Sequence, residues 1–479
     1  MEGVDAGYLY METPSMHMHT LKIAIVEPAS TDGPEGGPTG GGAHEPSYFT
    51  EVVLDRLADL PAFSRRVLPA PFGLHHPLWV ADRPIDPARH IFVHRLPESE
   101  GMAGLEELIG EIGSTPLDRS VPLWELHVTE PTMTADGGPR VAVVAKMHHA
   151  LADGGAANAL LSHVTDAIRA TEGAPARRDL DPTPRLLTQV RRAITDHAVQ
   201  VRLLPRLLRD TLLGVLRVVR IGRRSSVSVP RPLLDAPRTS LNGPLSPRRG
   251  FATATVSLAD VRATAKAHDV TVNDLVLGLV SGALRSWLAS TGEQPSSSLL
   301  AGVPVGTDTA DVLALHGPRL AGNRVSNLFT TLATDVDDPT ERLRLISATT
   351  RQAKLVQQTL GPDLLREWVE FTPPLPMSWA MKGYSRVRGA ALHSPPFNVV
   401  VSNVRGPGKA VTIADARLVD LFSVGPILEG IGLNVTAWSY DGRLNFSLLG
   451  CPDLVADLRP IAAGLVPALE EYRAAVPKG

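Results

Sequence analysis

Short apolar runs alternate with amphipathic stretches along most of this 479-residue chain, and this alternation constrains its fold more than any other feature. Short apolar or alternating runs are typical of strands, and repeats at three and four residues are typical of helices. We predict strands at residues 20–26, 141–147, 299–305, 397–401 and 444–448, and helices at residues 48–60, 155–170, 258–268, 273–288 and 339–358. This mixture indicates an α/β protein.

One stretch, residues 172–248, interrupts the alternation because it is rich in Arg and Pro and has no strand pattern. A change of composition between two patterned regions is typical of a connection between domains. We therefore predict an N-terminal half at residues 1–171, a basic helical connection at residues 172–248 and a C-terminal half at residues 249–479.

The charge of the chain is unevenly distributed. The net charge is −3, but residues 185–224 hold ten Arg against two Asp, so this segment carries +8 and the remainder −11. A near-neutral chain lacks the basic surface that nucleic acid requires, so we expect no nucleic-acid partner. On a helical wheel, the arginines of residues 202–224 share one arc and Leu and Val lie opposite, which suits a helix on an anionic lipid surface. A linker helix packed on its own domain is the alternative.

The location of the protein can be predicted from three absences. Cys451 is the single cysteine, so internal disulfides and cysteine zinc clusters are excluded. The first residues lack the basic start and apolar core of a signal peptide, and no apolar run approaches the length of a membrane span. We expect a cytoplasmic protein, with residues 202–224 as a possible contact to the inner membrane or to lipid droplets.

Two adjacent histidines, His148 and His149, lie between an apolar run and a predicted helix, followed by Asp153 and Gly154. A junction between strand and helix exposes side chains at the mouth of a sheet. A neutral imidazole there can accept a proton near pH 7. Asp153 would fix the loop, and Gly154 would allow a backbone conformation closed to other residues.

Successive strand residues face opposite sides, so His148 and His149 should not both face one substrate, and this parity does not select the base. A purely structural pair, or a metal site with Asp153, are alternatives. No His-Glu-x-x-His string or cysteine pair supports a metal, and we expect none. There is also no Gly-x-Ser-x-Gly nucleophile. A histidine base would then activate a hydroxyl or amine of the substrate itself, which indicates direct group transfer.

The string from His148 to Gly154 resembles the HHxxxDG motif of CoA-dependent acyltransferases. Three further strings resemble motifs of the bacterial wax ester synthase/diacylglycerol acyltransferase family, and so do two shorter matches. The strings are Pro122-Leu123-Trp124, Asn273-Asp274 and residues 398–407; the shorter matches are Asp5 with Tyr8, and Gly322-Asn323. Their order agrees with the family from about residue 4 to residue 450. Residues 306–308 depart from it, because the family often has Ser and Arg there.

The resemblance implies a fold of two chloramphenicol-acetyltransferase-like α/β domains with mixed sheets and an active-site tunnel between them. It implies that His149 is the general base, with His148 beside it and Asp153 as the orienter of the loop. Acyl-CoA would be a co-substrate and no resident cofactor is expected; the acceptor would be diacylglycerol or a long-chain alcohol.

The resemblance also suggests roles for residues outside the histidine motif. Asn273 would stabilise an oxyanion or position the substrate, or else only cap a helix. Pro122, Leu123 and Trp124 would form a wall near the acyl group, and Gly154 would contact the substrate. Two other functions remain open at this point: a condensation-type transferase that uses a carrier-protein thioester, and a catalytically silent lipid-surface protein of the same fold.

Overall fold

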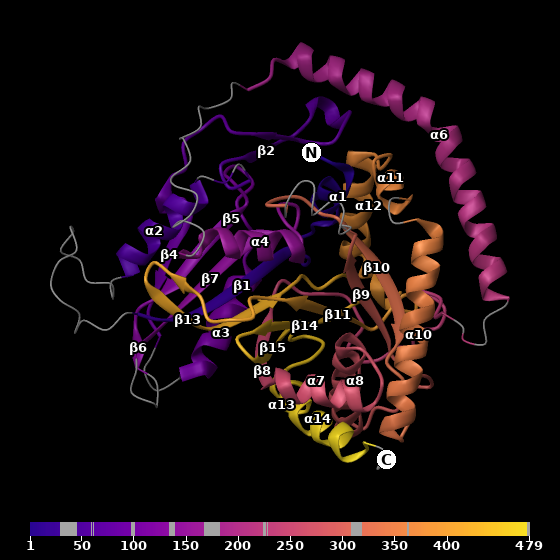
Figure 1. Ribbon diagram of the computed structural model, residues 1–479. Coiled ribbons are helices and arrows are strands. Elements are labelled where there is room, and N and C mark those ends of the chain that lie inside the picture. Colours follow the sequence, from indigo (N-terminus) through magenta and orange to yellow (C-terminus); the bar gives the residue numbers. More distant parts are fainter. Residues whose placement is uncertain are drawn as a thin grey trace.

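A computed structural model describes residues 1–28, 46–58, 60, 62–96, 101–133, 139–166, 183–223, 227, 229–307, 319–361 and 364–476 (Figure 1). Two mixed α/β layers lie side by side, each built on one large sheet (Figure 1). The predicted α/β fold of two domains with mixed sheets is therefore confirmed.

The first sheet has seven strands. They are, in spatial order, β12 (Thr412–Ile413), β13 (Ala416–Val424), β1 (His19–Glu27), β7 (Pro139–His148), β5 (Trp124–Thr129) and β4 (Ile91–His94), with β6 (Thr132–Met133) also paired to β7. Alternate residues of β7 face opposite sides. Val141 and Val143 pack beneath α2 (Pro46–Ala58) and α4 (Gly154–Val164), whereas Ala142 and Val144 pack against α3 (Gly101–Ser114).

The second sheet has six strands. Their order is β10 (Val325–Thr331), β9 (Leu300–Gly306), β11 (Val399–Arg405), β14 (Leu433–Tyr440), β15 (Arg443–Gly450) and β8 (Gly250–Ser257). β11 runs parallel to both of its neighbours, and the other pairs are antiparallel. One face packs on α7 (Leu258–Ala267), α8 (Val272–Ser290), α10 (Pro339–Leu360), α13 (Arg459–Ala463) and α14 (Leu465–Ala474).

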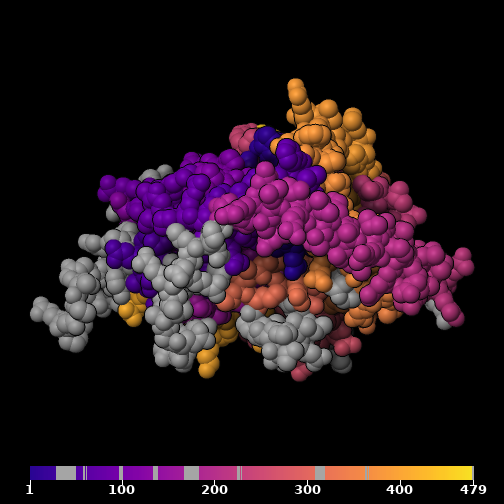
Figure 2. Space-filling view, turned by 90° about the horizontal axis from the view of Figure 1, so that it is seen from above, coloured from indigo at the N-terminus to yellow at the C-terminus, as the bar shows by residue number. Residues whose placement is uncertain are grey.

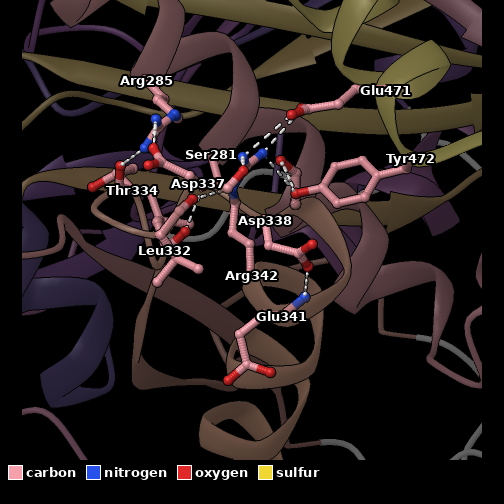
Figure 3. A network of polar contacts seen from close by, with 12 residues as sticks. Ser281, Arg285, Leu332, Thr334, Asp337, Asp338, Glu341, Arg342, Glu471 and Tyr472 are labelled. Carbon is pink, nitrogen blue, oxygen red and sulfur yellow. Dashed lines mark hydrogen bonds and ion pairs between the residues drawn. The ribbon is translucent and has the colours of Figure 1, made fainter. Parts of the chain in front are cut away.

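The start of α10 is fixed by polar contacts around Arg342, whose side chain is 1% exposed (Figure 3). Its guanidinium donates to the carbonyl oxygens of Val336 and Asp337 at 3.1 and 2.9 Å and pairs with Glu471 at 3.0 Å. Asp338 caps the helix, because its side chain accepts from the amide of Glu341. This buried cation joins α10, the turn before it and α14.

Short elements complete the molecule. They are α1 (Gly3–Met11), α11 (Leu364–Val369), α12 (Pro374–Arg386), the small sheet of β2 (Arg66–Leu68) and β3 (Leu78–Val80), and the turns η1 (Pro71–Gly73), η2 (Pro87–Arg89) and η3 (Gly389–Ala391). Helix α1 packs against α11 and α12. The first residues of the chain therefore contact a segment some 360 residues away, as the bond from the Gly3 amide to Glu370 at 2.6 Å shows.

The predicted boundaries of the halves do not coincide with the two sheets. β12 and β13 belong to residues 249–479, yet they extend the first sheet, where β13 pairs with β1. The chain thus returns to its N-terminal domain before it completes the second sheet. A division at residues 171 and 249 needs this correction, because pairing between strands distant in sequence leaves no local pattern.

The predicted connection, residues 172–248, contains one long helix, α6 (Leu186–Gly222), which arches over the outside of the molecule (Figure 1). The helix continues through Pro205. Ala193, Leu207 and Gly214 are its buried positions, on the side that faces the body. No helix in the described part of the chain combines the length and the apolar character needed to cross a bilayer.

Candidate active site

A cavity of about 400 Å³ lies between the two sheets. The first domain contributes Thr20 and Lys22 of β1 and the residues after β7, and the second contributes residues of β9, β10, β11 and β14. Helices α1, α11 and α12 close one side. The resemblance placed the active site between two domains, and this cavity occupies that place.

His149 is presented to the cavity by the end of β7. Its amide donates to the carbonyl oxygen of Met18 at 2.8 Å, which extends the pairing of β7 with β1 by one residue. Met18 has a φ of 53°, in the left-handed region that residues other than glycine rarely adopt. The imidazole stacks on Tyr8 of α1, with ring centroids 4.2 Å apart. Its orientation is therefore set by packing as well as by the strand.

Asn323 fixes the tautomer of His149. The Asn323 amide nitrogen donates to the carbonyl oxygen of His149 and to Asp5, both at 2.8 Å, so the side-chain oxygen must be the atom that faces the imidazole. That oxygen lies 3.0 Å from Nδ1 of His149. Because it can only accept, Nδ1 carries the hydrogen, and Nε2 keeps its lone pair.

His149 is neutral near pH 7. Burial lowers its pKa to about 4, and the charge of Lys22 acts in the same direction, while Asp153 and the bond to Asn323 oppose them. A neutral imidazole with a free Nε2 can accept a proton from a hydroxyl group in the cavity. This is the chemical capacity that the sequence predicted for one of the two histidines.

Asp153 connects the histidine loop to the segment that carries Asn323. One oxygen accepts from the Ala156 amide and caps α4. The other accepts from the Arg319 side chain at 2.8 Å and from the Arg324 amide at 2.7 Å. Although burial opposes it, the bond from Ala156 and the charge of Arg319 hold the pKa of Asp153 below its usual range. Asp153 thus orients the loop, and it also places Asn323.

His148 lies away from the cavity. Its ring is 1% exposed; Nδ1 accepts from the Ala150 amide, and Nε2 lies 3.5 Å from a carboxylate oxygen of Glu12. His148 is therefore not placed to touch a substrate in this cavity, contrary to its inclusion among the catalytic residues. In the described part of the chain, no three His, Cys, Asp or Glu side chains are arranged to hold a metal ion.

Asn273 is not among the residues that line the cavity of His149. It lies in the first turn of α8, which packs in the core of the second domain. It does not cap the helix either, because Thr271 accepts from the Asp274 amide and Asp274 bonds back to Thr271. The asparagine that reaches the base is Asn323, which the family match had marked without a role.

Pro122, Leu123 and Trp124 do not form one continuous wall, because their side chains lie in three different environments. Trp124 lines a second, apolar cavity of about 90 Å³ between the first sheet and helices α2 and α4, and its indole donates to the carbonyl oxygen of Phe63 at 2.8 Å. Leu123 is buried in the core, and Pro122 lines a groove on the surface. Gly154, by contrast, lines the cavity of His149 as predicted.

Sequence reasoning missed Lys22, which lines both cavities. A single lysine in an apolar strand has the pattern of a solvent-facing position, so no local signal marked it. Tyr8 and Asp5 carried a signal, because they matched the N-terminal pattern of the family, but the pattern gave them no role. Residue 308, part of the departure from the family, lies outside the described residues.

Comparison with known proteins agrees with this geometry. The chain matches the family model of the wax ester synthase/diacylglycerol acyltransferase catalytic domain over residues 1–276, and that of the WS/DGAT C-terminal domain over residues 321–473. A Mycobacterium tuberculosis protein provisionally named diacylglycerol O-acyltransferase is 36% identical over 475 residues, which cover 99% of this chain and 96% of that protein. Another from the same organism is 31% identical and covers 97% of this chain and 94% of its own length.

Solved structures show the same fold. The wax ester synthase/diacylglycerol acyltransferase from Marinobacter aquaeolei VT8 gives a TM-score of 0.64 at 24% identity, covering 99% of this chain and 98% of that one. The starter condensation domain of rhizomide synthetase gives 0.55 at 12% identity, covering 100% and 94%. Fold and site together define a two-domain acyltransferase with an HHxxxDG histidine.

Within that class, the matches over nearly the whole length are decisive. The chain belongs to the wax ester synthase/diacylglycerol acyltransferase family.

Proposed function

We propose that this protein transfers a long-chain acyl group from acyl-CoA to the hydroxyl of diacylglycerol, giving triacylglycerol, and to long-chain alcohols, giving wax esters. The observation that carries the proposal is His149, a neutral imidazole with a free Nε2 that faces the cavity between the two sheets. The names of the relatives support the choice of acceptors.

The reaction follows from the tautomer of His149. Nε2 removes the proton of the acceptor hydroxyl as its oxygen attacks the thioester carbonyl carbon. The tetrahedral intermediate collapses, the C–S bond breaks, and the CoA thiolate takes the proton back from the imidazolium. Asn323 accepts from Nδ1 throughout and holds the ring in place. A direct transfer of this kind needs no nucleophile from the protein.

The two cavities separate the reacting atoms from the alkyl chain. The apolar cavity is lined by aliphatic side chains of β7, α2 and α4, among them Met147, Leu57 and Leu160, and its lining suits the part of the alkyl chain next to the thioester. The larger cavity holds polar groups such as Asn327, Ser402 and Thr436 and suits the glycerol or alcohol hydroxyl.

The test is CoA release from palmitoyl-CoA with diacylglycerol, hexadecanol or both as acceptors. We expect His149→Ala to lower the rate by about 10²–10⁴-fold, the usual contribution of a general base. His163→Ala on α4 is the control and keeps the rate. An unchanged rate in His149→Ala would refute the mechanism. Activity with a carrier-bound acyl thioester and none with acyl-CoA would instead identify a condensation-type enzyme.

We also propose that α6 binds an anionic lipid surface. Its positions form three stripes: the buried one against the body, an exposed apolar one and an arginine one. The exposed apolar stripe is Val201, Leu208, Leu212, Val215 and Val219, with Leu212 60% exposed. The arginine stripe is Arg202, Arg206, Arg209, Arg217 and Arg220, beside it. Apolar and cationic groups side by side on one helix match the interface of an anionic bilayer.

The position of α6 supports this partner, because the helix lies along the surface when the molecule is seen from above (Figure 2). We expect Leu208→Ser with Leu212→Ser to weaken flotation with anionic liposomes by about a hundredfold or more, since burial of each leucine contributes about 1.5–3 kcal/mol. Val466→Ser, which changes an exposed residue of α14, is the matched control. Equal flotation of the wild type and the α6 variant would make the segment a linker only.

A further inference from the structure

We propose that Lys22 is a catalytic residue: its ammonium group binds the carbonyl oxygen of the acyl thioester and stabilises the oxyanion formed when the acceptor attacks. The proposal rests on the proposed function, since its ligand is the acyl thioester of that reaction.

The sheet that forms the floor of both cavities places Lys22 at their boundary. β1 lies between β7 and β13, and Lys22 pairs with Ala145 on one side and Ser423 on the other. Residues directly opposite each other in antiparallel strands share a face. We call a set of facing residues on neighbouring strands a row, so that successive rows on one face are two residues apart. In the row on one side of Lys22, Ala24 lines the apolar cavity; in the row on the other side, Thr20 lines the cavity of His149.

The same transition occurs on the neighbouring strands. On β7 the change comes one row nearer His149: Met147, opposite Thr20, still lines the apolar cavity, and His149 lines the larger one. On β13, Leu421 and Ser423 divide in the same way. An acyl chain in the apolar cavity therefore has its carbonyl end at the row of Lys22.

The reach of the side chains fits a substrate between them. Lys22 lies two rows from the row of Met18 and His149, and each row spans about 6.8 Å along a strand. Both side chains line the same cavity, so a bound thioester carbonyl and an acceptor hydroxyl can lie between them. The charge of Lys22 is near enough to lower the pKa of His149.

Lys22 also lacks the partner that an enclosed cation normally has. Its ammonium donates to the Ser423 hydroxyl at 2.5 Å and lies 4.8 Å from the centre of the Trp438 ring, but no carboxylate of the described residues is within 4 Å. Lys146, on the same sheet, pairs with Glu125 at 2.9 Å. An ammonium has three N–H groups, and an enclosed charge without a counter-ion destabilises the fold. A ligand oxygen that becomes negative would supply what is missing.

The balance of the step is simple. As the acceptor oxygen bonds to the carbonyl carbon, the π electrons move onto the carbonyl oxygen beside Lys22, and His149 holds the hydroxyl proton. The electrons then return, the C–S bond breaks, and the thiolate receives the proton from His149. Lys22 keeps its own proton throughout, so it must be charged while His149 must be neutral.

Because Lys22 must be charged while His149 must be neutral, the reaction rate should depend on pH in a characteristic way. Enclosure lowers the pKa of Lys22 to about 7, with the charge of Asp153, the N-cap of α4, opposing it. The rate should therefore fall as the pH rises through about 7. Asp5, whose pKa burial raises to about 7, becomes negative over the same range and would support the imidazolium, so its effect on the rate has the opposite sign.

The experiment compares full-length wild type, Lys22→Met, Lys22→Arg and the surface control Lys266→Met, with palmitoyl-CoA and diacylglycerol from pH 5.5 to 9. We expect Lys22→Met to lower kcat by about 10²–10³-fold, as for other oxyanion donors, with little change in KM for palmitoyl-CoA. Lys22→Arg should keep part of the activity and lose the fall near pH 7, because a guanidinium stays charged. Lys266→Met should match the wild type.

The outcomes separate the two hypotheses. If the wild type releases no CoA from any acyl-CoA, the proposed function fails. If the wild type is active and Lys22→Met stays within threefold of it, or if only KM rises, the role of Lys22 is overturned. A falling limb that persists unshifted in Lys22→Arg overturns it as well. Lys22→Arg also keeps the test decisive if Lys22→Met does not fold.

Discussion

Two enclosed cations, Arg342 and Lys22, show how differently the two domains use buried charge. The guanidinium of Arg342 donates to two carbonyl oxygens and to the Tyr472 hydroxyl, and it pairs with the Glu471 carboxylate (Figure 3). Lys22 contacts one hydroxyl and one aromatic face and borders two cavities. A cation whose contacts are complete within the chain stabilises the fold, whereas one with contacts to spare beside a cavity is available to a ligand.

The sharpest test of this comparison is to remove Arg342. Arg342→Met leaves the carbonyl oxygens of Val336 and Asp337 without their donor, so we expect the free energy of unfolding to fall by about 3 kcal/mol. Urea denaturation followed by circular dichroism measures the change, and kcat per folded molecule should stay the same. Arg344→Met, which breaks an exposed pair with Glu341, should cost less than about 0.5 kcal/mol. If both variants lowered the free energy of unfolding by the same amount, Arg342 would stabilise the fold no more than an exposed arginine does.

The next largest effect concerns the orientation of the base. Asn323→Ala removes the acceptor of the Nδ1 hydrogen of His149, so the imidazole can turn and exchange tautomers. We expect kcat to fall by about 10–100-fold, or about 1.4–2.7 kcal/mol of barrier, with unchanged KM for acyl-CoA. Steady-state kinetics measure both. If only KM changed, Asn323 would act on substrate binding rather than on the base.

Lys22 should behave opposite to Arg342 in stability. Lys22→Met removes an enclosed charge that has no carboxylate partner, so we expect the free energy of unfolding at pH 7 to rise by about 1 kcal/mol. The sign of the pH dependence follows from its lowered pKa: between about 7 and 10.5 the unfolded chain binds the extra proton, so Lys22 makes stability increase with pH in the wild type. The difference between wild type and Lys22→Met should therefore shrink as the pH rises. A constant difference would contradict this assignment.

The smallest effect is expected at Asp5. Asp5→Asn keeps an oxygen that can accept from the Asn323 amide, so kcat should change by less than about threefold, or about 0.7 kcal/mol. The fall in rate above pH 7 should remain, because this variant leaves Lys22 in place. If the fall in rate above pH 7 disappeared in Asp5→Asn, the group responsible for it would be Asp5 and not Lys22.

The sequence predicted what local pattern determines. The strands at residues 20–26 and 141–147 lie within β1 and β7, and α8 and α10 begin within one residue of the predicted starts, because apolar periodicity and caps such as Asp338 are local. The prediction that His148 and His149 face opposite sides of the strand also agrees with the structure. The choice between them required the position of the cavity, which depends on the second domain.

What the sequence could not predict depends on distant contacts. Asn273 and Asn323 are equally visible as motif residues, and only the bonds of Asp153 to Arg319 and Arg324, about 170 residues away, show which asparagine reaches the base. Lys22 gained its significance from cavities on either side of one strand. The family resemblance supplied the overall fold and His149, but it gave no role to Lys22.

The pairing of β13 with β1 also has a consequence for how the enzyme is made. A ribosome produces residues 19–27 well before their partner on one edge, residues 416–424. Until then β1 has an open edge, and the wall that Ser423 contributes to both Lys22 and the cavity is missing. The nascent chain therefore has a complete HHxxxDG loop without a complete active site, so esterification must wait until residues 416–424 have been made and have paired with β1.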